Sequence, residues 1–276
     1  MIVIAEKLNG SIPSCAKAIA AKDDAYLKDI AAKEAAANAT FIDACASVKD
    51  GELETLKWMI DAIQAATDTP ISVDSPDVNV CIEAMKYVVS KGGKPGLFNS
   101  VSGEGNKIDV AFPILASEDY KKWDVMALLC DDTGIPKTAA DRIRVFDAVM
   151  AKAAQYGIAD KRIHIDPLIE MLCTTDDGEG ISMVLEVMRH IKETHPQVHI
   201  SGAVSNISFN LPARKLVNQA FVVLAINAGM DSGVLDPLSQ DLMGVIYAAE
   251  AMIGLDDFCA EYTSAYREGI FGVKKA

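Results

Sequence analysis

Carboxylate and amide side chains recur where the short apolar runs of this chain end. In a parallel α/β barrel the C-terminal ends of the strands open onto one face, where the active site lies. Asp and Asn accept hydrogen bonds, and few Lys, Arg or His residues stand beside them. The pattern predicts a site for a polar, neutral ligand rich in N–H donors and argues against a phosphate. Seven of eight apparent strands end this way, at Asp43, Asp74, Asn99, Asp131 with Asp132, Asp166, Asn206 and Asp236.

Asp74 and Asp166 are the clearest members of this set. Each is the first charged residue after three or more mostly apolar ones. Burying a carboxylate is costly unless it is hydrogen-bonded or paired, and no Arg or Lys adjoins either residue. A ligand with amine and ring N–H groups would supply the missing donors. The alternative is that each Asp caps the helix that follows it.

Asn99 and Asn206 offer both a carbonyl acceptor and an amide donor, which suits a heterocycle with alternating donors and acceptors. The alternative for each is an Asx-turn that ends its strand. Asn206 lies in a dense polar stretch, residues 205–210, which favours the binding interpretation there. Glu6 and Asn9 after the first strand, and the segment 131–136 after the fifth, fit either a site or a turn.

The elements that must position these residues alternate regularly along the chain. Strands followed by helices of ten to fifteen residues indicate βαβ units and a parallel sheet. Eight such units without an orphan strand favour a closed (β/α)8 barrel, and 276 residues suit a single barrel domain over residues 1–276. The strands are expected at 2–6, 41–45, 71–75, 96–100, 125–130, 163–167, 199–205 and 232–236. The helices include 24–38, 52–66, 77–89, 139–156, 178–194 and 212–227.

Turn residues support these boundaries. Gly92, Gly157 and Gly229 follow helices where a left-handed C-cap is expected. The stretch from Asp256 to Ala276 resembles an added helix that closes the barrel bottom or meets a partner subunit.

Composition excludes several classes of protein. A formal charge of -13 opposes sequence-independent binding to nucleic acid and to anionic membranes. No membrane span and no signal peptide are recognisable, and the six cysteines form no C-x-x-C pair, so a reduced, cytoplasmic protein is expected. His195 and His199 are four apart, but Pro196 breaks the helix that a metal site would need, so no metal is expected. His164 lies inside a strand and is interpreted as a packed core histidine.

Short motifs in a fixed order resemble a known family. They are Glu6-Lys-Leu-Asn-Gly10, Phe41-Ile-Asp43, Val73-Asp-Ser75, Phe98-Asn-Ser100, Thr133-Gly-Ile-Pro-Lys137, Ile165-Asp-Pro-Leu168 and Ser205-Asn206. The sequence resembles, over almost its whole length, the pterin-binding methyltransferases that move methyl groups between tetrahydrofolate and a corrinoid protein. It is most similar to the tetrahydrofolate methyltransferases of bacterial demethylation pathways, such as those for glycine betaine. The acetogenic methyltetrahydrofolate:corrinoid/iron–sulfur protein methyltransferases form the other close branch.

The resemblance implies a (β/α)8 barrel, usually a homodimer, with the pterin in its mouth. It implies that Asp74, Asn99 and Asp166 hold the pterin ring, and that Asn206 reaches N5, which carries the methyl group. Glu6, Asn9, Gly202, Ser205 and Arg214 also match positions near the folate. The cobalt would arrive on a separate corrinoid protein, so no bound metal is needed. Asp43, Asp131, Asp132 and Asp236 receive no role.

This chain departs from the acetogenic branch at four positions. Cys45 replaces an Asn, Asp131 and Asp132 replace Asn and Lys, and Phe209 replaces a Gln near N5. A thinner polar network around N5 favours tetrahydrofolate as the methyl acceptor, because methyl removal from N5 gains most from proton delivery. The expected direction is therefore from methyl-corrinoid to tetrahydrofolate.

Three alternatives remain open. One is the reverse transfer to a corrinoid/iron–sulfur protein. Another is dihydropteroate synthase, but the chain lacks that family's Ser-Thr-Arg loop, its late Ser-Arg-Lys motif and the rim cations that would hold a pyrophosphate. The third is a pterin- or corrinoid-binding accessory protein without catalytic activity. No D-x-H-x-x-G corrinoid signature is present, so the chain is not expected to retain cobalamin itself.

Overall fold

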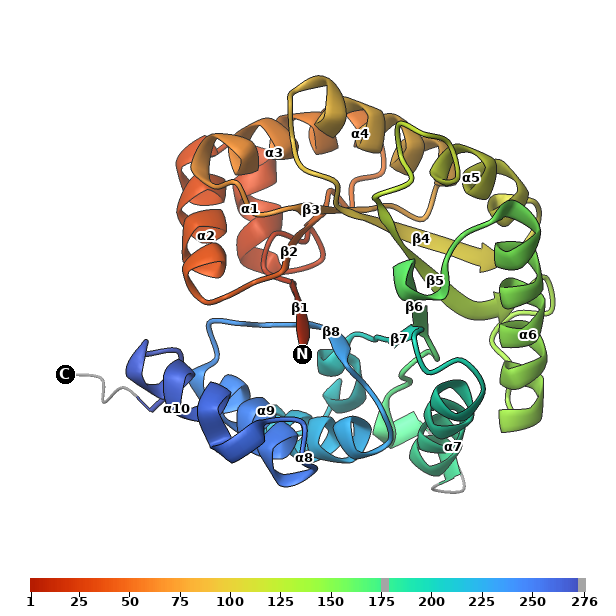
Figure 1. Cartoon of the computed structure of the whole chain (residues 1–276). Helices are drawn as coiled ribbons and strands as arrows, with labels where there is room; N and C mark the ends of the chain where they lie inside the picture. Colours follow the sequence, from red (N-terminus) through yellow and green to blue (C-terminus); the bar gives the residue numbers. More distant parts are fainter. Residues whose placement is uncertain (175–178, 273–276) are drawn as a thin grey trace.

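A computed structural model describes residues 1–174 and 179–272, and its strands pair in parallel into one sheet. The sheet has eight strands in the order β7-β6-β5-β4-β3-β2-β1-β8. Figure 1 shows the helices arranged around the outside of this sheet. The strands are β1 (Ile2–Ala5), β2 (Phe41–Cys45), β3 (Ile71–Asp74), β4 (Leu97–Gly103), β5 (Asp124–Asp131), β6 (Ile163–Asp166), β7 (His199–Ile200) and β8 (Ser232–Leu235). The predicted (β/α)8 barrel is confirmed.

The helices match most of their predicted boundaries. Two agree at both ends, α3 (Glu52–Ala66) and α6 (Ala139–Tyr156). Gly178, the expected start of another, lies outside the described residues. The remaining helices are α1 (Pro13–Ala21), α2 (Asp24–Ala36), α4 (Val78–Ser90), α5 (Lys107–Leu115), α7 (Glu179–Thr194), α8 (Arg214–Asn227), α9 (Gln240–Met252) and α10 (Ala260–Arg267).

Local chemistry explains several of these boundaries. The side chains of Asp23, Asp77 and Thr138 accept backbone N–H groups at the starts of α2, α4 and α6, as N-caps do. Gly157 ends α6 with φ 74°, the predicted left-handed cap. Helix α8 begins at Arg214 rather than at Pro212, because Ala213 has φ 52° and interrupts the helical backbone.

The seam between β7 and β8 differs from the prediction. A strand over 199–205 was expected, but β7 contains only His199 and Ile200. Gly202 has φ 155°, and the chain then enters the 3-10 helix η3 (Val204–Ser208). An isolated bridge between Ala203 and Val234, with a 3.0 Å bond from the Val234 amide to the Gly202 carbonyl, closes the barrel. Asn206 therefore lies in a 3-10 helix and not at the end of a strand.

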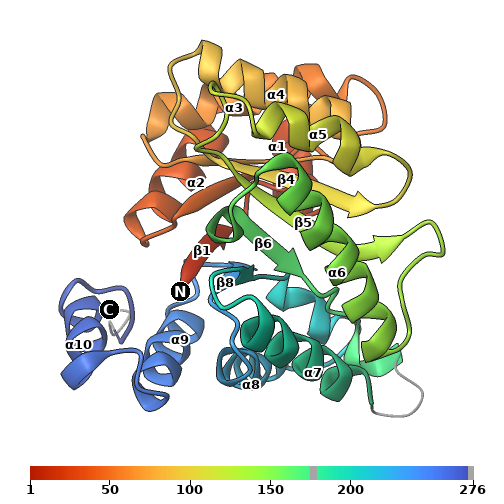
Figure 2. The ribbon, with the colours of Figure 1, turned by 45° about the vertical axis from the view of Figure 1, so that its right-hand side comes forward.

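The main hydrophobic core lies between the sheet and the surrounding helices, and a smaller group of Ile4, Phe41, Leu97 and Met126 fills the barrel interior. Helix α10 packs against α9 at the side of the barrel, away from the strands (Figure 2). Within the described residues, no helix combines the length and apolar character that crossing a bilayer requires. The helix expected after Asp256 is present, whereas residues 273–276 are outside the described part of the chain.

Candidate active site

Five buried or half-buried acids converge around the mouth of the barrel, and all have raised pKa values. We call Glu6, Glu34, Asp43, Asp74 and Asp166 the mouth acids. They come from the segment after β1, from α2, and from β2, β3 and β6. Burial is the first cause of each shift, because a low-dielectric environment disfavours the charged form.

Asp43 and Asp74 interact directly and shift each other's pKa. Their side chains are hydrogen-bonded to each other, and burial and the Asp74 charge raise the pKa of Asp43 well above its ordinary value. Burial raises the pKa of Asp74 to about 6, while hydrogen bonds from Cys45 and Asp43 lower it. Two carboxylates in contact cannot both ionise easily, so Asp43 keeps the proton and Asp74 carries the charge.

Strand register creates this pair. Residue 43 lies opposite Ser72, and Cys45 lies opposite Asp74. The Ser72 hydroxyl donates to Asp43 Oδ1 at 2.5 Å, and Asn99 Nδ2 donates to the same atom at 3.3 Å. Asp43 is thus a fully buried residue in the middle of β2, and not at its end as predicted. Its contacts with Asn99 and Asp74 hold these two side chains in place.

Asp166 is fixed by its own loop. Its Oδ1 accepts the Leu168 amide at 2.7 Å, which is an Asx-turn. Burial raises the pKa of Asp166 to about 6, whereas the Leu168 amide and the charge of Arg142 lower it. No Arg or Lys of the described residues forms an ion pair with Asp166, and Arg142 of α6 acts on it only through its nearby charge.

Arg142 is fully buried and ties two loops together. Its guanidinium donates to the carbonyls of Pro136, Pro167 and Leu168, and pairs with Glu170 at 2.7 Å. These contacts hold the segments after β5 and β6 against each other. Gly202 lies beside Asp166, since a Cβ there would stand 3.4 Å from Asp166 Oδ1 and 2.5 Å from Ile169. A larger residue would push into this wall.

Asn206 lies in η3 and is partly exposed. Its side chain makes no hydrogen bond to any residue that the structure describes, so its amide is available to a ligand. The neighbouring Ser205 hydroxyl donates to Glu6 Oε2 at 3.1 Å. Burial raises the pKa of Glu6 to about 7, although the Ser205 bond lowers it.

Arg214, at the start of α8, stacks over the Phe209 ring with 4.5 Å between the guanidinium carbon and the ring centroid. Its nitrogens donate to Ser208 Oγ at 3.0 Å and to the Ser205 carbonyl at 2.8 Å. The guanidinium therefore holds the turn that carries Asn206. Phe209 itself is 42% exposed at the protein surface.

Other predicted residues form the loops around the mouth. Asn9 Oδ1 accepts the Ser11 amide at 2.8 Å and the Ser47 hydroxyl at 3.4 Å, which holds the first loop next to β2. Asp131 accepts the Thr133 amide at 2.9 Å in a turn, and Asp132 accepts the Gly105 amide at 2.8 Å. Asp236 pairs with Lys7 at 2.8 Å. The last three acids thus have structural contacts, as caps and turns do.

Glu34 was not singled out from the sequence. One carboxylate oxygen accepts the Lys7 amide at 2.9 Å, while the other is buried without a hydrogen-bond partner among the described residues. Burial raises the pKa of Glu34 to about 8. The available signal was a charged residue on the inward face of α2, which is otherwise formed by the apolar Leu27 and Ala31.

A second polar cluster lies at the opposite end of the barrel, and we call it the base cluster. It contains His164, Lys192, His199, Asp231 and Ser232. His164 is fully buried, with Nδ1 3.0 Å from Ser232 Oγ, which agrees with its predicted place in the core. Asp231 contacts Lys192 at 2.8 Å and His199 at 3.1 Å. Burial opposes ionisation, but these two hydrogen bonds hold the pKa of Asp231 below its ordinary value.

The described side chains at the site are mainly hydrogen-bonding groups. Across residues 1–174 and 179–272, no three His, Cys, Asp or Glu side chains are grouped to hold a metal ion. The six cysteines are free thiols. Burial raises the pKa of the thiols of Cys15, Cys45, Cys81 and Cys130, so these four are protonated near neutral pH.

Comparison with known proteins identifies relatives of the whole chain. The pattern of the family described as pterin binding enzyme matches residues 20–236. A methylcorrinoid:tetrahydrofolate methyltransferase of Eubacterium limosum is 44% identical over 100% of both proteins. A methionine synthase of Mycobacterium tuberculosis is 26% identical over 85% of this chain, which corresponds to 20% of that larger protein.

Solved structures show the same architecture. A Yersinia pestis dihydropteroate synthase superposes with a TM-score of 0.64 at 18% identity, covering 92% of this chain and 93% of that one. A 7,8-dihydropteroate synthase from Vibrio fischeri gives a TM-score of 0.62 at 21% identity, covering 91% and 92%. Similarity at this level of identity establishes the fold alone.

Proposed function

This chain belongs to the family of pterin-binding enzymes, and we propose that it transfers a methyl group from a methyl-corrinoid to N5 of tetrahydrofolate. The observation that carries the proposal is the full-length relative at 44% identity whose name states this reaction. The polar mouth of the barrel supports it, because its acids and amides match a ring rich in N–H groups.

Asp74, Asn99 and Asp166 are the proposed pterin holders. Asp74 is charged while Asp43 keeps its proton, so Asp74 can accept the exocyclic amine or a ring N–H. The hydrogen bond from Asn99 Nδ2 to Asp43 orients the Asn99 amide, and its carbonyl oxygen is proposed to accept a hydrogen bond from the pterin. Gly202 has no side chain, which lets its backbone pack closely against Ile169 beside Asp166.

Asn206 is the proposed residue at N5. In the transfer, the N5 lone pair forms a bond to the methyl carbon while the cobalt–carbon bond breaks and leaves both electrons on cobalt. N5 must attack as the neutral amine, which has one N–H bond and a lone pair. After it gains the methyl group, N5 is positively charged and releases the N–H proton. An amide can donate to neutral N5 and can accept from N5–H, so Asn206 suits both stages. Alignment of the two partners supplies most of the catalysis.

Glu6 is the proposed receiver of that proton. Burial raises its pKa to about 7, and its Oε2 accepts a hydrogen bond from Ser205, the residue next to Asn206. A carboxyl with this pKa is about half ionised near neutral pH and can exchange a proton with solvent. Asn9, Ser205 and Arg214 complete the proposed site by holding the surrounding loops.

The methyl donor is proposed to be a separate corrinoid protein, since the name of the full-length relative gives a methylcorrinoid as the donor. We further propose that residues 1–276 act as one pterin-binding domain, that two copies form a homodimer, and that the reaction takes place in the cytoplasm. The six free thiols agree with a reducing compartment.

The test follows the absorbance of cobalamin while tetrahydrofolate is added to methylcobalamin and the purified protein. We expect demethylation of the corrinoid and formation of 5-methyltetrahydrofolate. Asp74→Ala and Asn206→Ala should be much slower, whereas the exposed controls Asp147→Ala and Asn227→Ala should match the wild type. If both site variants keep full activity, the site assignment is wrong.

The same assay separates the alternatives. Much faster transfer from methyltetrahydrofolate to cob(I)alamin under matched conditions would favour the reverse direction. Tight binding of tetrahydrofolate without turnover would favour an accessory protein. Condensation of a pterin pyrophosphate with p-aminobenzoate would favour dihydropteroate synthase.

A further inference from the structure

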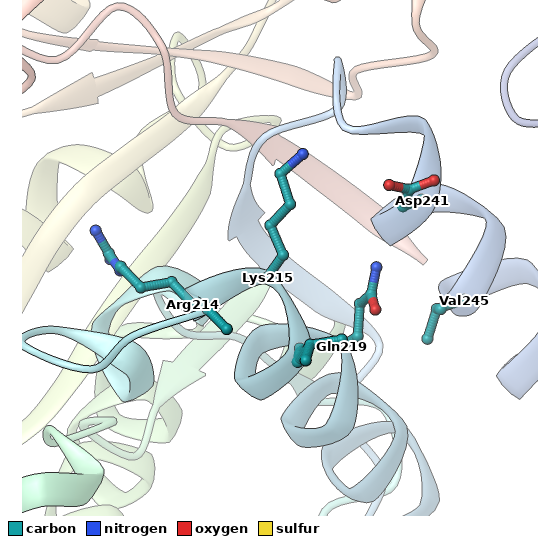
Figure 3. A pocket seen from close by; sticks show the side chains of 7 residues that line it. Arg214, Lys215, Gln219, Asp241 and Val245 are labelled. Carbon is teal, nitrogen blue, oxygen red and sulfur yellow. The ribbon is translucent and has the colours of Figure 1, made fainter.

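A cleft leads from the mouth outward between α8 and α9. Its inner part is a cavity of about 230 Å³ that begins at Glu6 and Ser205. Its outer part is an open groove of about 700 Å³ bordered by Asp241 and Val245 of α9. Arg214, Lys215 and Gln219 of α8 line both parts, so the two form one path (Figure 3).

The cleft contains positive charge that the protein leaves uncompensated. Lys215 makes no ion pair and no hydrogen bond with the described part of the chain, and its amine projects toward the cleft beside Gln219 (Figure 3). Arg214 donates only to neutral oxygens, those of Ser205 and Ser208. Both cations lie at the N-terminus of α8, where the helix dipole adds to the attraction for an anion.

The inner cavity also contains an acceptor without a donor. Oδ1 of Asn218 is buried and receives no hydrogen bond from the described residues. A buried carbonyl oxygen without a donor is unfavourable, and an N–H group entering the cavity would satisfy it. Val204, Leu235 and Leu242 give the same cavity an apolar wall.

We propose that this cleft binds the tail of the folate substrate, with its aromatic amide inside and its glutamate carboxylates at Lys215 and Arg214. The proposal rests on the proposed function, because that function makes a folate the ligand. Each γ-linked glutamate repeats one carboxylate and one amide N–H, which are the groups that Lys215 and Asn218 lack. Folates with several glutamates are therefore the preferred substrates.

Three acids also line the cleft, and they set the limits of this attraction. Asp236 is already paired with Lys7 at 2.8 Å. Glu6 is half neutral near pH 7, since burial raises its pKa to about 7. Asp241 lies at the outer edge, in the first turn of α9, and repels a carboxylate that extends beyond Lys215.

The test compares the KM of the enzyme for tetrahydropteroate, its monoglutamate and its triglutamate, with methylcobalamin as donor. We expect KM to fall as glutamates are added. Lys215→Gln should raise the KM for the triglutamate about two- to fivefold more than that for tetrahydropteroate, the range for an exposed ion pair. Lys161→Gln, which removes the same charge near the start of β6, should keep the wild-type order.

A gain-of-affinity variant tests the same cleft from its other wall. Asp241→Asn removes the repulsion and should lower the KM for the triglutamate about twofold, while the monoglutamate changes less. High salt should reduce every difference between the three folates. Equal KM values for all three folates in an active wild-type enzyme would overturn the tail site and leave the proposed function standing.

Loss of the proposed function would look different. If no methyl transfer is found with any folate, binding of the same three compounds is measured by titration calorimetry. Glutamate-dependent affinity that Lys215→Gln abolishes would then support the cleft alone. Affinity that is independent of the glutamates would reject it.

Discussion

The two ends of this barrel each bury a polar cluster, and the clusters differ in how their charges are compensated. In the base cluster, Asp231 is matched by Lys192, His199 and the Ile200 amide, and its pKa is lowered. At the mouth, burial raises the pKa of Asp74 and Asp166 to about 6. Asp166 stands on the same strand as His164 of the base cluster, two residues away.

The difference separates a structural network from a binding site. A matched carboxylate stabilises the fold, whereas an acid whose ionisation is disfavoured destabilises it until a partner arrives. Binding sites commonly retain such unfavourable buried charge, and substitutions that remove it raise stability while they reduce activity. The mouth acids should therefore respond to mutation in the opposite sense from the base cluster.

The largest effect on activity is expected for Asp74→Ala. Removal of a charged acceptor for the pterin should lower kcat/KM about 100- to 1000-fold, which corresponds to about 3–4 kcal/mol of lost transition-state stabilisation. The melting temperature at pH 7.5 should rise or stay constant, because a disfavoured buried charge is gone. A clear drop in the melting temperature together with the loss of activity would break the contrast between the two ends.

Glu34→Gln should show the cost of a buried acid directly. An acid whose pKa rises from 4.5 to about 8 on folding contributes stability below pH 4.5 and loses it as the pH rises through about 8. Gln resembles the protonated form, so the variant should gain about 3–5 kcal/mol at pH 9 and about 1 kcal/mol or less at pH 5. Urea unfolding at both pH values measures this. Glu193→Gln, an exposed control, should show equal stability to the wild type at both.

Asn206→Ala is expected to reduce kcat about 10- to 100-fold with little change in KM, because the proposed partner of its amide is N5 and not the ring edge proposed for Asp74. The check is a steady-state assay with varied tetrahydrofolate. A variant that loses affinity with unchanged kcat would move Asn206 from the reacting atom to general binding.

Asp231→Asn should give the smallest effect and the opposite pattern. Loss of the ion pair with Lys192 should destabilise the fold by about 1–2 kcal/mol, since the pair is only partly buried. The kcat should remain that of the wild type because the base cluster lies at the far end of the barrel. Differential scanning calorimetry with a parallel activity assay tests both parts. Reduced kcat at full stability would show that the two ends are coupled.

The sequence allowed the barrel and most element boundaries to be predicted, because caps and alternation act locally. The prediction of β7 over 199–205 was wrong, since a turn and η3 replace the strand after Ile200. Apolar and small residues in that stretch resemble a strand, and only the geometry of the seam shows otherwise.

The candidate residues could be proposed from the sequence, but the contacts between them could not. Asp43 stood in the set without a role, because its pairing with Asp74 depends on the register between β2 and β3. Arg142 precedes Asp166 by 24 residues, and no local pattern links them. Glu34 meets the first loop through the Lys7 amide, a contact between helix and loop that neither segment encodes alone.

The short β7 gives a folate bound at the proposed site a second role, in the stability of the barrel. Asn206 lies close to the seam where the isolated bridge between Ala203 and Val234 joins the two ends of the sheet. Asp74 and Asn99, in contrast, lie on the paired strands β3 and β4 across the mouth. A ligand bound to residues on both sides would connect them across the sparsely paired seam between β7 and β8. Without ligand, the β7–β8 seam should therefore open locally more often than the rest of the sheet. Binding of the substrate should stabilise the closed barrel before the methyl group is transferred.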